Sequence, residues 1–326
     1  MKALLKFLVG MGAAIASSGA FPQAAWKPVK AVELVVGVAP GGAVDISARL
    51  AQRVWKNQGV LDNVIVVNKP GGGNIVSWAY MGQQAADAHY VLVQAPNLLT
   101  NKIHGITKLT YSDFTPLCLM FEEFMAVSVR ADSPIKTGKD LVARLRKDPA
   151  SLSIGVASAV GNHIHTAIAK PLKEAGVDIK KLKVVAFKSS GDSMVALLGG
   201  HIDVVSSSTP NALAQLRTGK THILAVSSAR RFGGDLAQVP TWPEQGIRGE
   251  FSSWRGLLGP KGISPGQVAY WEGACAKLSE ADEWNKALAH EFWVGRYLNS
   301  ADTSKYWEAQ YAEYKEILGA IGLAKE

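Results

Sequence analysis

A short turn, Ala39-Pro40-Gly41-Gly42-Ala43-Val44-Asp45, has the residue types needed to hold an anion. It joins an apolar stretch to an amphipathic helix pattern, and its glycines permit a sharp turn and a close approach by a ligand. The first N–H groups of a helix have no partner within it, and the helix dipole makes that end positive. A carboxylate can therefore bind there without an arginine, although an ordinary strand-to-helix turn stabilised by Asp45 gives the same spacing.

A second turn of the same kind runs from Ala157 to His165, and it also follows a strand pattern and opens a helix. Ser158 and Asn162 are residue types that cap a helix or donate hydrogen bonds to an anion. Two such turns, one in each of two facing domains, would suit a ligand with a carboxylate at each end.

The pair His163-x-His165 contains residue types that bind metals. On a helix these two side chains point in different directions, and no cysteine or carboxylate cluster accompanies them. We therefore predict no metal and no cofactor, and assign the histidines to helix capping or ligand contact.

Two other polar segments leave alternatives open. The run from Asn68 to Asn74, which contains Gly71-Gly72-Gly73, fits either backbone contacts to an anion or a plain flexible loop. The run Ser206-Ser207-Ser208 ends a strand pattern, where its hydroxyls can donate to a ligand or simply make a turn.

Motifs for catalysis are absent from the sequence. There is no Gly-x-Ser-x-Gly, no His-Glu-x-x-His and no paired-carboxylate motif. A serine and a histidine brought together by folding remain an open alternative, because such sites are defined in space. The sequence therefore favours a binding protein over an enzyme.

The elements that must position these turns alternate between strand and helix patterns. Helix patterns follow Gly42, cover Asp140 to Lys147, begin near Asn162, cover Met194 to Leu198 and open at Thr209-Pro210. Strand patterns cover Leu34–Val38, Val64–Val67, Val91–Val93, Ser153–Val156, Val184–Phe187, Ile202–Val205 and Ile223–Ser227. This alternation predicts parallel sheets with helices on both faces.

The last segment has a strong helical pattern. Apolar side chains recur on one face at Trp307, Tyr311, Tyr314, Leu318 and Ile321. We expect this helix to dock on a domain surface. No flexible linker separates the segments, so domain crossings should be direct strands that act as a hinge.

Length and composition bound the class of protein. The chain has 326 residues, of which 48% are hydrophobic and 19% charged, as in globular proteins that form more than one domain. Its formal net charge of +8 is scattered, without a basic run interleaved with aromatic residues. The charge favours a small anionic ligand and gives no support for nucleic-acid binding.

Residues 1–25 have the pattern of a secretory signal peptide. Lys2 and Lys6 precede an apolar stretch from Phe7 to Ile15, and small residues suited to cleavage follow at Ser17–Ala20 and at Ala24-Ala25. The apolar stretch is too short to span a membrane, and no later stretch approaches about 18 uncharged apolar residues.

The two cysteines, Cys118 and Cys275, are too few for a disulfide scaffold. An oxidising compartment would permit a bridge between them, but their distance is not given by the sequence. We favour two buried free thiols.

Taken in order, these motifs resemble the receptors of tripartite tricarboxylate transporters, also called the Bug family (Bordetella uptake gene products). The resemblance spans roughly residues 30–325. It rests on an ordered set of residues: Pro40, Gly41, Gly42, Asp45, Asn68, Pro70, Gly71, Asn74, Asp113-Phe114-Thr115-Pro116, Ser158, Gly161, His165, Lys188, Leu197, Leu198, Gly199, Gly200, Asp203, Pro240-Thr241, Glu244, Gly246, Trp254, Gly256 and Pro260.

Several residues depart from the family pattern within the predicted ligand turns. Val44 stands where the family has threonine, so a hydroxyl donor is missing. Ala159 replaces glycine and Asn162 replaces serine, and the glycine loop is one residue short. The altered positions leave backbone donors in place while changing side-chain donors, so the family's usual ligands do not transfer directly.

The resemblance implies an α/β, two-lobed periplasmic-binding-protein fold of the type II kind, which closes like a Venus flytrap about two crossing strands. We expect a signal peptide at 1–25, lobe one at 27–126 plus 250–326, and lobe two at 127–249. The crossings are expected near Ala126–Arg130 and Phe251–Leu258.

The implied function is capture of a small carboxylate in the periplasm by a monomer, for delivery to the membrane permease subunits of a tripartite tricarboxylate transporter. An extracytoplasmic sensor and, less favoured, a secreted hydrolase are the alternatives.

The predicted ligand-binding residues are Gly41, Gly42, Ala43, Val44, Asp45, Ser158, Gly161, Asn162, His165, Asp203 and Ser207. The two aspartates cannot accept from an ionised carboxylate, so they would hold water or orient loops. Because proline at Gly42 would remove an N–H at the helix start, we expect that variant to lose binding while remaining folded.

Overall fold

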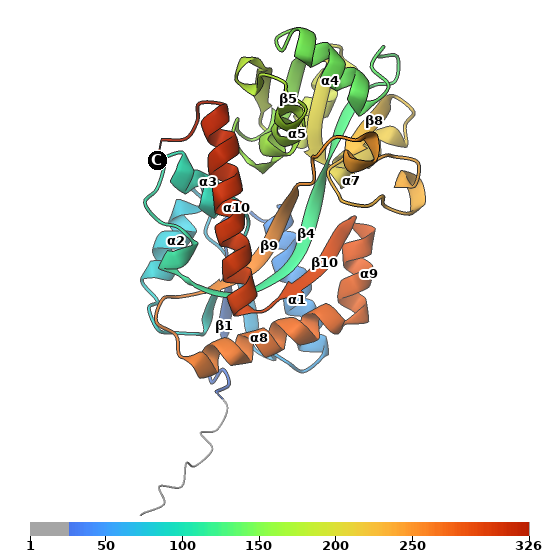
Figure 1. Ribbon diagram of the computed structural model, residues 1–326. Helices are drawn as coiled ribbons and strands as arrows, with labels where there is room; N and C mark the ends of the chain where they lie inside the picture. Colours follow the sequence, from blue (N-terminus) through green and yellow to red (C-terminus); the bar gives the residue numbers. More distant parts are fainter. Residues whose placement is uncertain (1–25, 326) are drawn as a thin grey trace, which may run out of the picture.

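The computed structural model describes residues 26–325, and the predicted signal peptide lies outside the described residues. Figure 1 shows two α/β lobes joined by a long strand, β4 (Thr115–Arg130), that runs through both. The predicted two-lobed fold is confirmed. Among the described helices, none is both long enough and apolar enough to cross a membrane.

Each lobe has its own sheet, and β4 belongs to both. In lobe one, β4 joins β1 (Val32–Val36), β2 (Val64–Asn68), β3 (Tyr90–Gln94), β9 (Ser252–Gly259) and β10 (Trp293–Leu298). In lobe two, it joins β5 (Ser153–Ala157), β6 (Lys183–Phe187), β7 (Val204–Ser208) and β8 (Thr221–Val226). The strand order along the main path is β2-β1-β3-β9-β4-β7-β5-β6.

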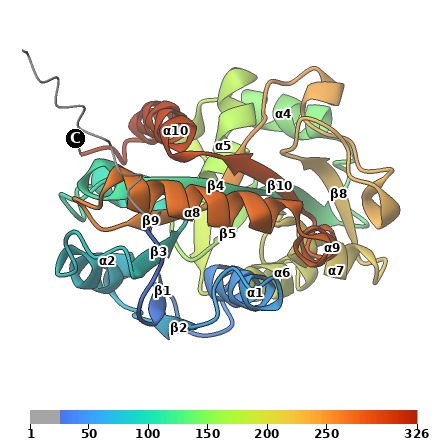
Figure 2. The ribbon, with the colours of Figure 1, turned by 90° about the horizontal axis from the view of Figure 1, so that it is seen from below.

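The helices pack on both faces of these sheets. Those of lobe one are α1 (Ala43–Asn57), α2 (Ile75–Gly82), α3 (Asn97–Ile103), α8 (Pro265–Glu280), α9 (Asp282–His290) and α10 (Ser300–Ala320). Those of lobe two are α4 (Gly138–Lys147), α5 (His163–Glu174), α6 (Ser190–Leu198) and α7 (Thr209–Leu216). Seen from below, α1 and α10 lie on opposite sides of β4 and β9 (Figure 2).

The sheets are mixed, which differs from the predicted parallel arrangement. Strands β1, β2 and β3 pair in parallel, as do β5, β6 and β7. The long strand β4 pairs antiparallel with β7, β8, β9 and β10. The prediction followed the alternation of strands and helices, which does not reveal that the long strand β4 pairs antiparallel in both lobes.

The crossing of β4 lies at Phe124 and Met125. Up to Phe124 the strand pairs with β9, and from Met125 it pairs with β7. The second crossing lies at Phe251, just before β9, where its N–H donates to Ser227 O at 2.9 Å. The first crossing thus comes slightly earlier in the chain than the expected Ala126–Arg130.

Ser227 ties the two crossings together, directly after β8. Its hydroxyl accepts from Met125 N at 2.9 Å and donates to Phe251 O at 2.6 Å. Its backbone N–H also donates to Met125 O at 2.8 Å. Since Ser227 is fully buried, these hydrogen bonds have no competition from water.

Replacement of Ser227 by alanine should lower the free energy of unfolding by about 1–2 kcal/mol, because it leaves Met125 N–H and Phe251 C=O buried without that partner. Denaturant titration measures the loss. Ser279→Ala is the control, since its hydroxyl makes only a local bond to Ala276 O within α8, at 2.7 Å. Equal losses in the two variants would contradict the role of Ser227 at the crossing.

The last helix, α10, packs against both lobes. Its Trp307 and Tyr314 are fully buried with residues of lobe one, whereas Ile317 lies in the core of lobe two. Two ion pairs, Lys170–Glu313 and Lys173–Glu316, also join α5 to α10. The sequence pattern predicted the helix and its buried face, but not that the helix reaches the second lobe.

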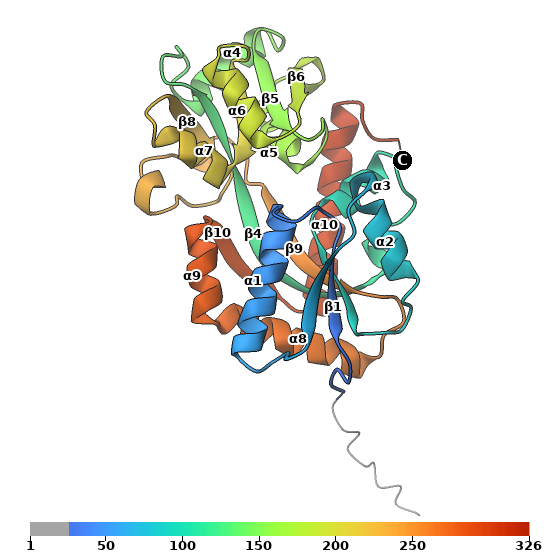
Figure 3. The ribbon, with the colours of Figure 1, turned by 180° about the vertical axis from the view of Figure 1, so that it is seen from behind.

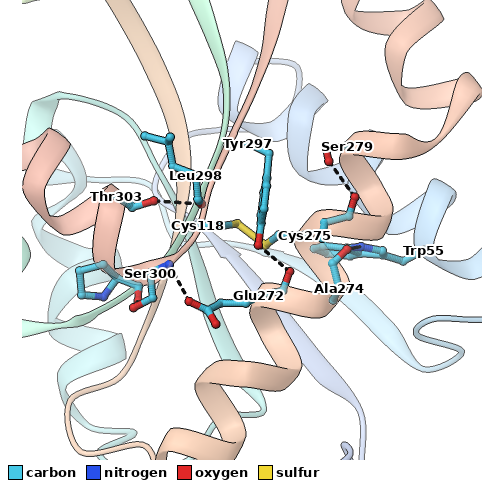
Figure 4. Close-up of a disulfide and its surroundings, with 12 residues drawn as sticks. Trp55, Cys118, Glu272, Ala274, Cys275, Ser279, Tyr297, Leu298, Ser300 and Thr303 are labelled. Atoms are coloured by element: carbon cyan, nitrogen blue, oxygen red, sulfur yellow. Dashed lines mark hydrogen bonds between the residues drawn. A yellow bond between two sulfur atoms is a disulfide. The ribbon is translucent and has the colours of Figure 1, made fainter.

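Cys118 on β4 and Cys275 on α8 form a disulfide in the core of lobe one, with their Cα atoms 6.6 Å apart (Figure 4). The prediction of two free thiols is therefore wrong. The two residues are 157 positions apart, and only the packing of α8 on β4 brings them together. Beside them, Trp55 of α1 donates to Ala274 O at 2.9 Å, so three elements meet at the disulfide.

Candidate functional site

The first predicted turn links β1 to α1 through Gly41, whose φ of +87° favours glycine. Gly42 is the N-cap of α1, with φ −74° and ψ 158°. In Figure 3 the N-terminal end of α1 points toward the lobe that contains α5. The predicted strand-to-helix turn is therefore present, and it lies on the side of lobe one that faces lobe two.

Asp45 holds this turn together from inside. The buried carboxylate accepts from Gly41 N and Arg49 Nε, each at 2.9 Å, and from Asn68 Nδ2 at 2.8 Å. Burial opposes ionisation of Asp45, but these donors outweigh it and lower the pKa of the carboxyl. Asp45 thus stabilises the turn, and Asn68, the last residue of β2, supports it by also donating to Val38 O at 2.9 Å.

The second predicted turn links β5 to α5 in the same way. Gly161 has a φ of +88°, and its N–H donates to His165 Nδ1 at 3.0 Å. Asn162 is the N-cap, and its Oδ1 accepts from Ile164 N at 3.0 Å and His165 N at 3.1 Å. The helix-capping role predicted for Asn162 agrees with these bonds.

His165 is buried and neutral. Burial lowers its pKa to about 4. Because Nδ1 accepts from Gly161 N–H, we assign the ring proton to Nε2, which has no partner among the described residues. Protonation of Nδ1 would break the bond that holds the turn.

Stability should therefore fall with acid. An unfolded histidine binds a proton below about pH 6.5, whereas His165 in the folded protein binds one only near pH 4, so stability is lost as the pH falls through this window. The slope for one such group is about 1.4 kcal/mol per pH unit. Burial also lowers the pKa of His104, so the total slope exceeds that of one group.

His165→Asn provides the measurement, since asparagine keeps an acceptor for Gly161 N–H and does not titrate. Denaturant titrations at pH 7, 6 and 5 should give a shallower loss of stability in this variant, by about 1.4 kcal/mol per pH unit. An unchanged slope would mean that His165 already binds a proton in the folded protein.

The two turns have the same plan. In each, a glycine with φ near +87° or +88° donates its N–H to the side chain four residues later, which is Asp45 in one and His165 in the other. The first helical residues, Ala43 and His163, are equivalent. Their N–H groups have no acceptor within the described part of the chain, so both are available to an anion.

The remaining donors predicted in these turns differ in availability. Val44 N–H likewise has no acceptor among residues 26–325. Gly41 and Gly161 N–H bond to side chains, and Gly42 N–H donates weakly to Ala39 O at 3.4 Å. Asn162 N–H has no internal acceptor in the described chain. The available donors thus lie at the first helical positions more than at the glycines.

The other predicted residues separate into two groups. Ser158 is exposed at the end of β5, and Ser207 is buried at the same edge of the parallel β5–β7 pair. Asp203 lies at the opposite edge, where Oδ2 accepts from Ser153 N and Oγ, each at 2.7 Å. The length of β5, roughly 15 Å for five residues, separates it from Ser158, so Asp203 braces the sheet away from the turns.

Two charged residues near the turns had no signal in the sequence. Arg255 on β9 and Glu123 on β4 form a buried ion pair, with 2.9 Å between Nη2 and Oε2. Burial, and then the charge of Arg255, lowers the pKa of His163 to about 3. Arg255 is thus electrostatically coupled to the first residue of α5, across the boundary between the lobes.

We also searched the described residues for a metal site and for pockets away from the two turns. They contain no group of three or more His, Cys, Asp or Glu side chains suited to a metal. A pocket of about 640 Å³ lies on lobe one beside Lys27, Tyr270 and Lys277, and no residue of either turn lines it. The arrangement of the turns is suited to binding an anion by hydrogen bonds.

Comparison with known proteins gives a consistent result. Residues 48–323 match the family model described as "Tripartite tricarboxylate transporter family receptor". The chain is 30% identical over 325 residues to the Cupriavidus necator "UPF0065 protein in gbd 5'region", covering 97% of this chain and 96% of the relative. The resemblance found in the sequence is confirmed.

Two solved structures are similar over most of their length. A TctC solute-binding protein from Polaromonas, solved without ligand, is 29% identical with a TM-score of 0.76, covering 90% of this chain and 99% of that one. The structure described as R. palustris Rpa4515 with adipate is 25% identical with a TM-score of 0.75, covering 91% of this chain and 99% of that one.

Proposed function

The chain belongs to the tripartite tricarboxylate transporter receptor family, and from this we propose that it is a periplasmic receptor that binds a small carboxylate between its lobes and presents it to membrane permease subunits. Family members are receptors rather than enzymes. The adipate of the R. palustris structure is a dicarboxylate, which supports that ligand class here.

One observation carries the proposal: each lobe has a strand-to-helix turn that leaves N–H groups available at the first helical position. Ala43 and Val44 supply them in lobe one, and Asn162 and His163 in lobe two. Hydrogen bonds from such groups to a charged carboxylate are each worth about 1.5–3 kcal/mol. Two sets of donors suit a ligand with a carboxylate at each end.

Closure about the crossings would then bring the two turns onto the ligand. The crossings at Met125 and Phe251 are both held by Ser227, so the lobes can rotate without separating. Ligand contacts with both lobes would favour the closed form, and the permease would recognise that form. In this scheme the receptor acts as a monomer, and Asp203 has no direct role.

A thermal-shift screen of mono-, di- and tricarboxylates on the mature protein tests this function. A bound ligand should stabilise the protein by about 2.7 kcal/mol at a hundredfold excess over its Kd, and mass spectrometry should recover it unchanged. Absence of a shift with every carboxylate would contradict the proposed ligand class. Conversion of the ligand would indicate an enzyme.

Delivery to a permease has its own test. Permease subunits should be retained from membranes by the liganded protein and not by the ligand-free protein. Retention of a signalling protein instead would favour the sensor alternative.

A further inference from the structure

The Arg255–Glu123 pair is enclosed and incompletely bonded. The two side chains are 4% and 7% exposed. Arg255 Nη1 donates to Ser253 Oγ at 3.0 Å and to Trp254 O at 2.9 Å, while Nη2 donates to Glu123 Oε2 at 2.9 Å. Among residues 26–325, Arg255 Nε has no acceptor, and Glu123 accepts only from Arg255. The pair therefore retains unused N–H donors on Arg255 and one unused oxygen on Glu123.

The pair lies on the face of the sheet that α1 covers. Arg255 is opposite Phe121 in the β4–β9 register, and its guanidinium carbon is 6.0 Å from the Phe121 ring centroid. Phe121 belongs to the same core as Val44, the second residue of α1. The preceding residue on β9, Trp254, lies on the other face and stacks on Trp307 of α10, with ring centroids 4.7 Å apart.

The pair also lies close to lobe two. Burial, and secondarily the charge of Arg255, lowers the pKa of His163, the first residue of α5. It sits on β9 only a few residues after the crossing at Phe251, and Glu123 lies two residues before the crossing at Met125. Helix α5 also packs against both β4 and β9, so this ion pair lies where elements of the two lobes meet.

An ion pair next to a carboxylate site changes what that site selects. A lone arginine would attract any second carboxylate, but Glu123 cancels its charge. The pair instead presents a donor beside an acceptor. A ligand group that can donate a hydrogen bond, either a hydroxyl or an ammonium, satisfies the Glu123 oxygen, whereas a methylene leaves it desolvated and unpaired.

We propose that Glu123 and Arg255 form a specificity site on the crossing strands, which selects carboxylates bearing a hydroxyl or ammonium donor over unsubstituted dicarboxylates of the same length. This inference rests on the proposed receptor function. Arg255 orients the Glu123 carboxylate, and Glu123 accepts from the ligand.

Matched ligands test the selection without altering the protein. Calorimetric titration of the mature chain should use succinate, malate and aspartate, and also adipate, 2-hydroxyadipate and 2-aminoadipate. In the series that binds, the substituted acids should bind at least tenfold more tightly than the unsubstituted one. Tighter binding of the amino acid would show that the ligand group donating to Glu123 is an ammonium, and tighter binding of the hydroxy acid would show that it is a hydroxyl. Equal or tighter binding of the unsubstituted acid would overturn the proposal.

Glu123→Gln tests the residue. This variant should lose at least tenfold affinity for the substituted acids, while the unsubstituted acid binds as well or better because Arg255 is no longer neutralised. Glu122→Gln is the matched control, because Glu122 has other partners: its Oε1 accepts from Ser252 Oγ at 2.6 Å, from Arg296 Nη1 of β10 at 2.7 Å and from Tyr306 Oη of α10 at 2.9 Å. Selectivity should be unchanged in this control.

The outcomes separate this inference from the receptor function. A uniform loss for all ligands in Glu123→Gln would make the pair structural only and overturn the proposal. Failure of Glu123→Gln to fold leaves the ligand series on the unaltered protein as the deciding measurement. Binding of other carboxylates but of neither series would also overturn the inference, whereas no binding of any carboxylate would overturn the receptor function itself.

Discussion

Replacement of Ala43 by proline should raise the Kd for the carboxylate ligand by about 10- to 100-fold without unfolding the protein, because it removes one hydrogen bond to a charged group. Ala43 is the first residue of α1, the helical position that accepts proline best. Gly42 before it has φ −74° and ψ 158°, which is the extended conformation that a residue before proline prefers. Isothermal titration of the variant and the unaltered chain measures the change.

This substitution replaces the earlier expectation for Gly42. The Gly42 N–H already donates to Ala39 O at 3.4 Å, so proline there would alter the turn as well as the donor. Asp282→Pro is the matched control, since Asp282 is the first residue of α9 and follows an extended Ala281 with ψ 127°. It should leave the affinity unchanged. Unchanged affinity in Ala43→Pro as well would exclude this helix start from the site.

Replacement of Gly161 by alanine should lower the free energy of unfolding by about 2–4 kcal/mol, through strain at positive φ and overpacking against lobe one. Gly161 has φ +88°, and an added Cβ would lie 2.6 Å from His104 Nε2 and 2.8 Å from Leu323 Cδ1. Both of these residues belong to lobe one, so relief of the overlap moves the α5 turn away from that lobe or displaces the two side chains. Ligand affinity should fall together with stability.

Gly41→Ala separates the backbone strain at positive φ from the steric overlap of the added Cβ. Gly41 has nearly the same φ, +87°, but an added Cβ there meets nothing within 4 Å among the described residues. Its loss of stability should be only about 1–2 kcal/mol, the cost of the backbone conformation. His104→Ala should restore part of the stability of Gly161→Ala. Equal losses at Gly41 and Gly161, measured by denaturant titration, would contradict contact between the lobes at this turn.

The two turns could be predicted from the sequence because their signals are local. Glycine at the left-handed position, a capping residue such as Asn162 and an apolar strand before it all lie within a dozen residues. Local signals of this kind do not show which side chains of a helix face the sheet. In α1, Ile46 is 44% exposed, whereas Val44 and Ala48 are buried where the helix meets the sheet.

Features that depend on pairing between distant segments had no local signal. Glu123 and Arg255 meet only through the β4–β9 register, across 132 positions of sequence. Cys118 and Cys275 likewise meet only through packing of α8 on β4. The position of Asp203, predicted as a ligand contact, likewise depends on strand pairing: it lies just before β7, at the opposite edge of the sheet, where its carboxylate accepts from Ser153 N.

The most direct test of carboxylate capture by the two helix starts is a crystal structure with the carboxylate that gives the largest thermal shift. Carboxylate oxygens should lie about 2.7–3.2 Å from the backbone nitrogens of Ala43 and His163, with the lobes closed on the ligand. A ligand bound with its carboxylates away from both turns, for example in the pocket beside Tyr270 and Lys277, would contradict the account.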